Sequence, residues 1–431
     1  MIISKRIKQD TNLNNWIKDD YHIIGDRIFD KKIKKQYDYI YVFSASIFDY
    51  SLEASAYRQN LIDLLQYAGL KQPVINVTYA NRADDINDYL AKLPNIVGDI
   101  EGLDNVLVIV HGPGNTVTES GPYPGGKEEA YEGMRTIVDA LHDAKADVLM
   151  ANLSFRKPPA SNPTAPYNKF VIEPLIKSRV PEAWDDYLDK PQFDLYSLFF
   201  KHQDKLRDGT HPNAALQYLL RNEIAKVISK KYTGVNSLTV DKLQSKSFCF
   251  GFANGSEYFQ GINPVIVNTD QGTSTEGVLG AASIICCRDT EGNTYPDMSL
   301  EAYDFANKNL EGRTIGSVTA PGVDNTEALS TSIYVNDPDN TVATVEITGL
   351  PNGLTGTVSI NASRNATASD RVGEYWIENY EHNMQTLDAA ANPPTPITFN
   401  FTVEDNKLSI KWRKQSGSTY AYLGVIKVDF D

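Results

Sequence analysis

The sequence has few cysteines, no long apolar run and no excess of positive charge. Three cysteines among 431 residues exclude a disulfide scaffold. None of them has the C-x-x-C spacing of a zinc knuckle, and no run approaches the ~18 apolar residues of a membrane-spanning helix. Lys and Arg number 41 against 55 Asp and Glu, a net charge of −14. This balance argues against a general nucleic-acid binder, which needs basic surface to replace phosphate counterions.

Several further signals are missing. The N-terminus, MIISKRIKQD, lacks the apolar core of a signal peptide, so we expect a soluble protein made in a reducing compartment. Cys286 and Cys287 lie in an apolar run, IICC, and we expect buried structural thiols. There is no G-x-S-x-G, H-E-x-x-H or EF-hand loop. GPYPGGK (121–127) imitates a phosphate-binding loop, but Glu128 stands where Ser or Thr would be needed.

Charge and composition divide the chain into four segments. Residues 1–36 hold nine Lys and Arg against five Asp and Glu, a net of +4, and we expect an arm that docks on an acidic partner or on its own acidic body. Residues 37–233 mix strand-like and helix-like patterns. Residues 234–431 hold 12 Lys and Arg against 24 Asp and Glu, in short alternating runs typical of β-structure. We divide them into a β-rich connecting module (234–330) and a C-terminal β-sandwich or jelly-roll domain (331–431).

Strands and helices alternate within residues 37–233. The expected strands are 39–43, 73–77, 105–110, 147–153 and, as a candidate fifth, 193–199. The expected helices are 57–68, closed by Gly69, then 83–93, 128–144 and a last one after Pro212. Such alternation predicts parallel strands with helices on both faces. Active sites of these sheets lie at the carboxyl ends of the strands.

Residues suited to ester hydrolysis stand at those strand ends. SAS (44–46) follows the first strand, NVTYANR (76–82) the second and HGPGNT (111–116) the third, and DGTHPN (208–213) precedes the last helix. A serine hydroxyl becomes a nucleophile when a histidine takes its proton. An acidic partner fixes the tautomer of that histidine, and amide donors hold the oxyanion. These blocks contain each of those parts.

In these four blocks the chain resembles the SGNH (GDSL-type) hydrolases. The resemblance implies a flavodoxin-like three-layer α/β/α fold and a serine esterase that needs no metal or cofactor. It assigns Ser46 as the nucleophile, with Asp208 and His211 as acid and base. It assigns Asn81 and Asn115 to the oxyanion hole. DGTHPN matches the last block of the family at every position.

The other blocks depart from the family pattern. Ser44-Ala45 precede Ser46 where the family has Gly-Asp, Asn81 stands where the family has glycine, and Thr116 follows Asn115 where Asp is usual. Ser44 therefore stays an alternative nucleophile. Without catalysis, Asp208 would serve as a cap of the last helix, and Asn115 as a turn residue in a glycine-rich loop.

SGNH domains with β-rich appendages and no secretion signal resemble polysaccharide deacetylases of bacteriophage tail spikes or tail fibres. The resemblance implies an O-deacetylase of bacterial surface polysaccharide, carried on a virion, made in the host cytoplasm and trimeric. Its partners would be the acetylated glycan and, through the arm, other tail proteins, with no nucleic acid and no membrane insertion. The acidic tail favours a neutral or weakly charged polymer. The alternatives are an inactive receptor-binding tail module and a lipid esterase or thioesterase.

Aromatic residues of the last segment offer surfaces on which sugar rings could stack. We expect most of them to fill the core instead. The candidates are Tyr375, Trp376, Tyr380, Trp412, Tyr420 and Tyr422.

Overall fold

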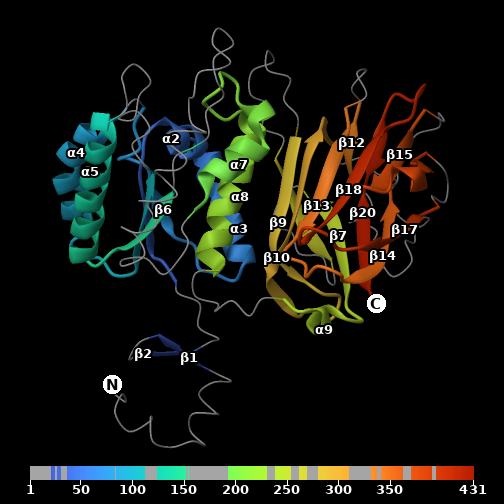
Figure 1. The fold of residues 1–431 in the computed structure, drawn as a ribbon, viewed down its shortest axis with the longest axis horizontal. Coiled ribbons are helices and arrows are strands. Elements are labelled where there is room, and N and C mark those ends of the chain that lie inside the picture. Colours follow the sequence, from blue (N-terminus) through green and yellow to red (C-terminus); the bar gives the residue numbers. More distant parts are fainter. Residues whose placement is uncertain are drawn as a thin grey trace, which may run out of the picture.

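The computed structural model contains an α/β body and a β-rich body that lie side by side along the long axis of the molecule (Figure 1). It describes residues 21–24, 27–30, 36–82, 84–111, 124–151, 154, 193–230, 238–253, 262–268, 280–309, 332–336, 341–362, 370–390 and 395–431. In the predicted arm, β1 (Tyr21–Ile24) and β2 (Arg27–Asp30) pair antiparallel and form a two-stranded sheet of their own. Among the described residues, no helix is long and apolar enough to cross a membrane.

The α/β body is built on four parallel strands in the order β4-β3-β5-β6. The strands are β3 (Tyr39–Phe43), β4 (Val74–Asn76), β5 (Val106–His111) and β6 (Asp147–Ala151). All four lie within one to two residues of the predicted limits. This order is that of flavodoxin-like sheets, in which the second strand of the chain lies outside the first.

Helices cover both faces of this sheet and enclose two separate apolar clusters. On one face α3 (Ser55–Tyr67) and α8 (Ala214–Lys230) pack against Ile40 and Val42 of β3. On the other face α4 (Ile86–Ile100) and α5 (Pro124–Asp143) enclose Tyr41 and Phe43. Successive residues of a strand point to opposite faces, so the continuous apolar run of β3 serves both clusters. The predicted three-layer α/β/α fold is confirmed.

Local signals set the ends of several helices. Asp85 accepts hydrogen bonds from the N–H groups of Asn87 and Asp88, and the carboxylate of Asp88 accepts one from the N–H of Asp85. This capping box starts α4. After α3, Gly69 takes a positive φ of 79° and the chain reverses, as its position predicted.

The predicted fifth strand, 193–199, is wrong. Phe193 forms a single parallel bridge with Ala151, and Leu195–Lys201 is the helix α7. The carboxylate of Asp194 accepts a hydrogen bond from the N–H of Ser197 and caps this helix. FDLYSLF is a short apolar run, and such runs do not distinguish a buried strand from a buried helix.

The β-rich body contains an eleven-stranded sheet in the order β16-β15-β18-β13-β10-β9-β8-β7-β20-β14-β17. Its strands are β7 (Ser247–Ala253), β8 (Asn263–Asn268), β9 (Gly280–Arg288), β10 (Thr294–Phe305), β13 (Ala343–Thr348), β14 (Thr355–Asn361), β15 (Val372–Ile377), β16 (Gln385–Asp388), β17 (Ile397–Thr402), β18 (Lys407–Lys414) and β20 (Val425–Phe430). A second sheet joins β11 (Asn307–Asn309), β12 (Ser332–Val335) and β19 (Ala421–Leu423). Short helices are α2 (Ser46–Leu52) and α9 (Val240–Leu243), with 3₁₀ turns η2 (Gln203–Lys205) and η3 (Glu381–Asn383).

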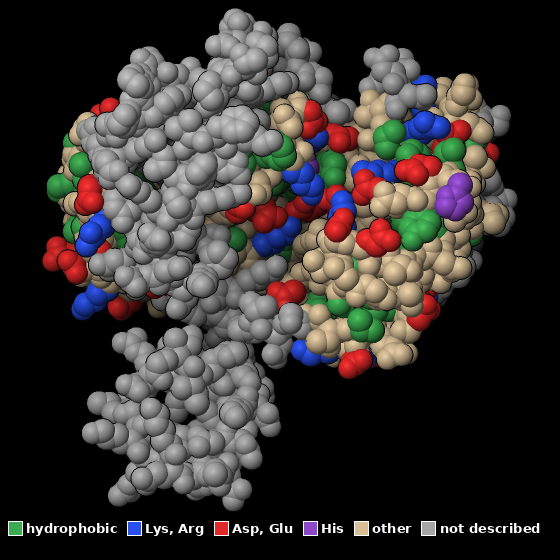
Figure 2. Space-filling view, in the orientation of Figure 1, with side chains coloured by type: hydrophobic (Ala, Val, Ile, Leu, Met, Phe, Trp, Pro, Cys, Tyr) green, Lys and Arg blue, Asp and Glu red, His purple; other side chains and the backbone are tan. Residues whose placement is uncertain are grey.

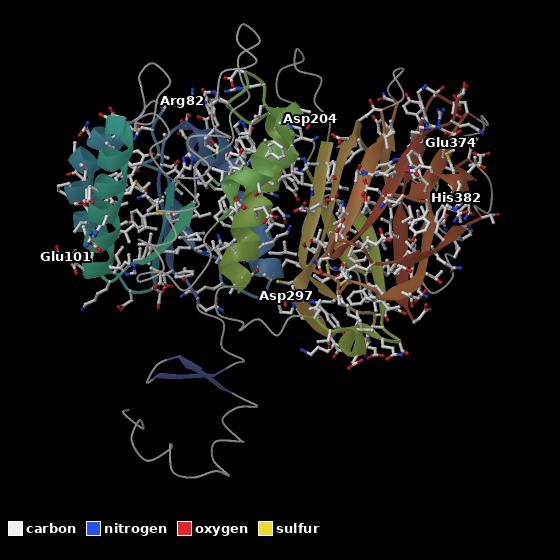
Figure 3. The ribbon with its side chains drawn as sticks, in the orientation of Figure 1. Arg82, Glu101, Asp204, Asp297, Glu374 and His382 are labelled. Carbon is white, nitrogen blue, oxygen red and sulfur yellow. The ribbon has the colours of Figure 1, made fainter. Side chains whose placement is uncertain are left out.

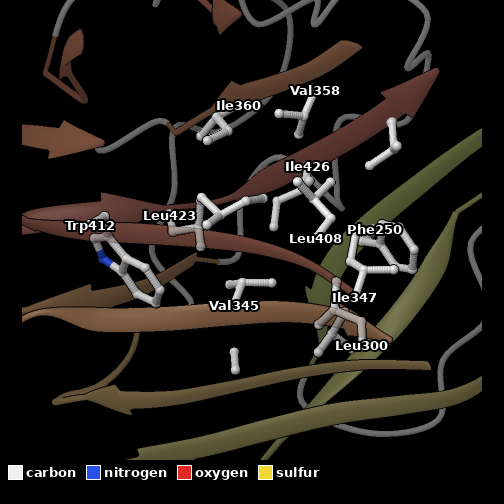
Figure 4. Packing of buried hydrophobic residues seen from close by; sticks show 14 of the residues in the cluster. Phe250, Leu300, Val345, Ile347, Val358, Ile360, Leu408, Trp412, Leu423 and Ile426 are labelled. Atoms are coloured by element: carbon white, nitrogen blue, oxygen red, sulfur yellow. The ribbon is translucent and has the colours of Figure 1, made fainter. Parts of the chain in front are cut away.

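The large sheet curls round its own core. Buried Phe250, Val345 and Trp412 belong to one apolar cluster inside it (Figure 4). The edge strands β16 and β17 approach each other, and the Nε2 of Gln385 donates to the carbonyl of Thr398 at 2.6 Å. The expectation of a β-rich C-terminal region is confirmed. Strands from both sides of residue 330 belong to this one sheet, and the domain division at 330 stays a prediction.

The two bodies are joined through a buried polar contact between α8 and the large sheet. The ammonium of Lys226 binds the carboxylate of Glu301, which also accepts from the amide of Asn222 at 2.7 Å. The hydroxyl of Ser283 donates to that of Tyr218 at 3.1 Å. Burial tends to raise the pKa of Glu301, but the charge and hydrogen bond of Lys226 together with the charge of Lys201 outweigh burial and lower the pKa to about 2. The helix that follows the DGTHPN block is therefore held by both bodies.

The three cysteines are free and buried, as predicted for Cys286 and Cys287. Burial raises the pKa of Cys249 to about 12 and that of Cys287 well above its ordinary value. The thiols of Cys249 and Cys287 therefore stay protonated and are unsuited to nucleophilic chemistry.

Candidate active site

Three of the predicted residues meet at the carboxyl end of the parallel sheet. The Oγ of Ser46 lies 3.0 Å from the Nε2 of His211. The Nδ1 of the same ring lies 2.6 Å from the Oδ2 of Asp208. Because a carboxylate only accepts, Nδ1 carries the proton, and Nε2 is left to accept from the serine hydroxyl. One hydrogen-bonded chain thus runs from hydroxyl to carboxylate.

The start of α2 presents Ser46. Ala45 occupies the N-cap position and makes no side-chain cap, and Ser46 is the first helical residue. Its hydroxyl is therefore directed to His211 rather than to the helix backbone. Its N–H lies in the first turn, where helical N–H groups have no acceptor within the helix.

A tight turn holds Asp208 and His211 together. The Oδ1 of Asp208 accepts from the N–H groups of Thr210 at 2.9 Å and His211 at 2.7 Å. Gly209 has a φ of 81°, which glycine adopts without strain. Burial tends to raise the pKa of Asp208, but the hydrogen bonds from His211 and Thr210 outweigh it and hold the pKa below its ordinary value. The carboxylate is ionised at neutral pH.

Asp208 is not the cap of the last helix. The side chain of Asn213 accepts from the N–H of Leu216 at 3.0 Å, directly before α8 begins at Ala214. Capping is thus performed by the last residue of the DGTHPN block. The carboxylate of Asp208 is left to the histidine.

The geometry distinguishes Ser46 from Ser44. Ser44 is fully buried, and its hydroxyl donates to the carbonyl of Ala45 at 2.9 Å. It continues the sheet through a bridge to Ala80. Of the two serines, Ser46 is the one within hydrogen-bond distance of His211.

The backbone N–H of Asn81, predicted as an oxyanion donor, has an acceptor in this structure. It donates to the carbonyl of Ser44 at 2.9 Å, and the Nδ2 of Asn81 lies 3.4 Å from the carbonyl of Thr78. The N–H that the prediction assigned to the oxyanion is therefore already engaged in extending the sheet. Asn115, the other predicted donor, lies outside the described residues. His111, at the end of β5, is buried beneath α2 with its ring 5.4 Å from that of Phe48.

Three further residues surround the histidine and were not predicted. Tyr50 lies against His211, with ring centroids 5.1 Å apart. The guanidinium carbons of Arg82 and Arg207 lie 4.1 Å and 4.4 Å from the centroid of the Tyr50 ring. Arg82, labelled in Figure 3 at this edge of the α/β body, also binds Asp49 at 2.9 Å. Tyr50 follows Ser46 by four residues, and this spacing on a helix was the available signal, because it places both on one face.

Among the described residues, no group of three or more His, Cys, Asp or Glu side chains is arranged to hold a metal ion. The side chains of Asp208 and His211 are 50% and 25% exposed. Both side chains of this pair are thus partly exposed.

The sequence matches no protein-family model and no curated protein. Solved structures match the chain over about half its length. A lipase/acylhydrolase of Enterococcus faecalis is 19% identical, covers 44% of this chain and 94% of its own, and has a TM-score of 0.35. A member of the lipolytic G-D-S-L family from Veillonella parvula is 12% identical. It covers 44% of this chain and 98% of its own, with a TM-score of 0.35. An acetyl xylan esterase is 13% identical. It covers 43% of this chain and 96% of its own, with a TM-score of 0.34.

Proposed function

We propose that this protein is a serine esterase that works through a covalent acyl-enzyme. The observation that carries the proposal is the hydrogen-bonded chain from Ser46 through His211 to Asp208, at 3.0 Å and 2.6 Å. Nucleophile, base and orienting acid have these mutual distances in acyl-transfer enzymes on unrelated folds.

The chemistry follows from the positions of the atoms. His211 takes the proton of Ser46 at Nε2 while the serine oxygen attacks the ester carbonyl. Asp208 keeps Nδ1 protonated and stabilises the imidazolium. The imidazolium then protonates the leaving alcohol, which departs and leaves acyl-Ser46. The same ring activates a water molecule, which releases the acid and restores the hydroxyl.

The oxyanion needs donors that point to it when the carbonyl carbon becomes tetrahedral. The N–H of Ser46, first in α2, is one donor in this proposal. The amide of Asn115 is the second, on the strength of the motif resemblance alone. The N–H of Asn81 joins them only when its bond to Ser44 opens.

For the substrate we propose O-acetyl groups of a bacterial surface polysaccharide, with the protein carried on a phage tail as a trimer. The motif resemblance supports this proposal, together with the β-rich body joined to α8. The excess of Asp and Glu in residues 234–431 favours a neutral or weakly charged polymer. The basic arm would bind other tail proteins.

Acetate release tests the esterase activity. Wild-type protein should release acetate from p-nitrophenyl acetate and from acetylated host polysaccharide, and Ser46→Ala should abolish both. Ser44→Ala is the matched control, two residues away, and should retain activity if it folds. Full activity in Ser46→Ala would contradict the proposal and direct attention to Ser44.

A second candidate is a binding module without catalytic activity. The observation that favours it is the engaged N–H of Asn81, which removes one expected oxyanion donor. A fluorophosphonate labels an activated serine but not an inert one. Labelling of wild type and not of Ser46→Ala would reject this candidate, and no labelling of either would reject the esterase.

A further inference from the structure

The β-rich body carries a hollow of about 330 Å³ where the two edge strands of its large sheet meet. The end of β15 and the turn η3 form one side, and β16 and β17 form the others. Its floor includes Ile377 and Phe399, each 4% exposed. A volume of this size lies within the range of small-molecule sites.

We propose that this hollow binds one or two residues of a neutral saccharide. Its rim carries Tyr380, which is half-buried, and Met384, which is 41% exposed. Met384 is one of four large apolar side chains exposed among the described residues. An aromatic ring beside a thioether offers a flat apolar surface, and the C–H face of a sugar ring packs on such a surface.

Amide groups supply the polar part of the site. Asn383, Gln385 and Asn400 line the hollow together with Thr398. An amide both donates and accepts, as a sugar hydroxyl does, so paired amides suit a ligand that carries neighbouring hydroxyl groups. Of the eight described residues that line the hollow, none is acidic or basic. An ionic ligand would find no counter-charge there, and this favours a neutral one.

Four of the six aromatic residues singled out in the sequence belong to the core. Tyr375, Trp376, Trp412 and Tyr422 are buried and offer no face to a ligand. Tyr380 and Tyr420 are half-buried, and of these two Tyr380 lines the hollow. Of the six aromatic residues, Tyr380 is therefore the one whose ring lines the hollow.

An extended peptide that adds to the sheet edge would be the competing occupant. Such pairing needs the outward carbonyl groups of β17. The carbonyl of Thr398 is already taken by the side chain of Gln385 at 2.6 Å. This bond occupies the edge near the start of β17, so the side-chain surface rather than the backbone is left to bind.

The hollow lies far from the proposed active site. Figure 3 labels His382, in the same turn as the hollow, near the outer end of the β-rich body, and Arg82 at the edge of the α/β body. On the face shown in Figure 2, acidic and basic side chains gather where the α/β body meets the β-rich body. The inference rests on the proposed function, because a saccharide bound in the hollow would hold the polymer while its acetyl groups are cleaved at the active site. Saccharide binding in the hollow does not itself require catalysis.

Calorimetric titration of the full chain tests the inference. The protein is the Ser46→Ala variant, which cannot turn over, and the probes are hexasaccharides of glucose, mannose, xylose and N-acetylglucosamine. We expect at least one to bind with a Kd below about 1 mM. Tyr380→Ala and Asn400→Ala should each weaken this binding by about tenfold. Tyr380→Phe should retain it.

Thr402→Ala is the matched control. Thr402 is an exposed residue of β17, as Asn400 is, but it does not line the hollow. It should bind like the parent. The inference is overturned if no neutral hexasaccharide binds, if Tyr380→Ala binds undiminished, or if only oligogalacturonate or a Thr-Val peptide binds. Release of p-nitrophenol from p-nitrophenyl acetate by Tyr380→Ala, made without the Ser46 change, should equal wild type. Saccharide binding without esterase activity would reject the proposed function and leave this inference standing.

Discussion

The ring of Tyr50 lies edge-on to the imidazole of His211, with centroids 5.1 Å apart and planes at 73°. Two guanidinium groups cover Tyr50 in turn, from Arg82 and Arg207. Arg82 is tied to Asp49 of α2 at 2.9 Å and to Glu53, directly after that helix, at 2.6 Å. Asp208 thus holds one nitrogen of the His211 ring, while Tyr50 packs against the ring itself.

The Tyr50 contact should matter for turnover more than for binding. Tyr50→Leu should lower kcat on p-nitrophenyl acetate by about 2- to 10-fold, the equivalent of an aromatic contact of about 0.5–1.5 kcal/mol. KM should change little, and Tyr50→Phe should restore kcat because it keeps the ring. Equal losses in Leu and Phe variants would show that the hydroxyl, rather than the ring, is responsible.

Asp208 should be essential although half of its side chain is exposed. Asp208→Asn keeps the shape but permits the wrong tautomer of His211, and kcat should fall about 10⁴-fold. Asn213→Ala, a change in the helix cap of the same block, should cost stability of about 1 kcal/mol and leave kcat nearly unchanged. Measured kcat and melting temperature for both variants separate catalysis from capping. A comparable loss of kcat in both would contradict the assignment of Asp208.

The sequence predicted those parts of the fold and the site that depend on short segments. The run YIYVF forms β3 between residues 39 and 43, and the DGTHPN block closes a turn through its own backbone. The prediction at 193–199 was wrong because a short apolar run fits either a buried strand or a buried helix.

Features that join distant residues could not be predicted. The strand β20 pairs with β7 and β14, so the last strand of the chain lies inside the sheet. The alternation of apolar and polar residues in VIKVDF does not specify β7 and β14 as its partner strands. The contact of two guanidinium groups with Tyr50 likewise brings residues 50, 82 and 207 together, and no local sequence pattern predicts this contact. The bond from the N–H of Asn81 to the carbonyl of Ser44 could not be predicted for the same reason, because it joins two separate strand ends.

The ion pair between the two bodies should be costly to break. Lys226 binds both Glu223 and Glu301, and Glu301 is 4% exposed. Lys226→Met leaves the carboxylates without a counter-charge and should lower the free energy of unfolding in urea by about 3–5 kcal/mol. Lys226→Met combined with Glu301→Gln should recover part of this loss.

Lys71 provides the control for that experiment, because it pairs with Asp38 at the exposed surface. Lys71→Met should leave the urea midpoint unchanged. Equal destabilisation by the two lysine substitutions would show that burial of the Lys226 pair is not the cause.

Acid should destabilise the junction of the two bodies in two steps. His202 is 2% exposed and packs against Tyr303, with Lys201 and Lys205 nearby and Glu301 and Glu346 opposing them. Burial and then the two lysines lower its pKa to about 4. The unfolded chain, with an ordinary histidine pKa of ~6.5, binds this proton more readily, so stability present above pH ~6.5 is lost as the pH falls to about 4.

Glu301 adds the second step. Its pKa of about 2 lies below the ordinary value of a glutamate, so its contribution is lost between pH ~4.5 and about 2. Urea unfolding measured every half unit from pH 7.5 to 2 should show the first decline above pH ~4, of roughly 3 kcal/mol at most, and the Glu301 step below it. His202→Gln, which cannot titrate, should flatten that decline while leaving the Glu301 step in place. An unchanged pH profile in His202→Gln would contradict the assignment, and the decline would then belong to other groups.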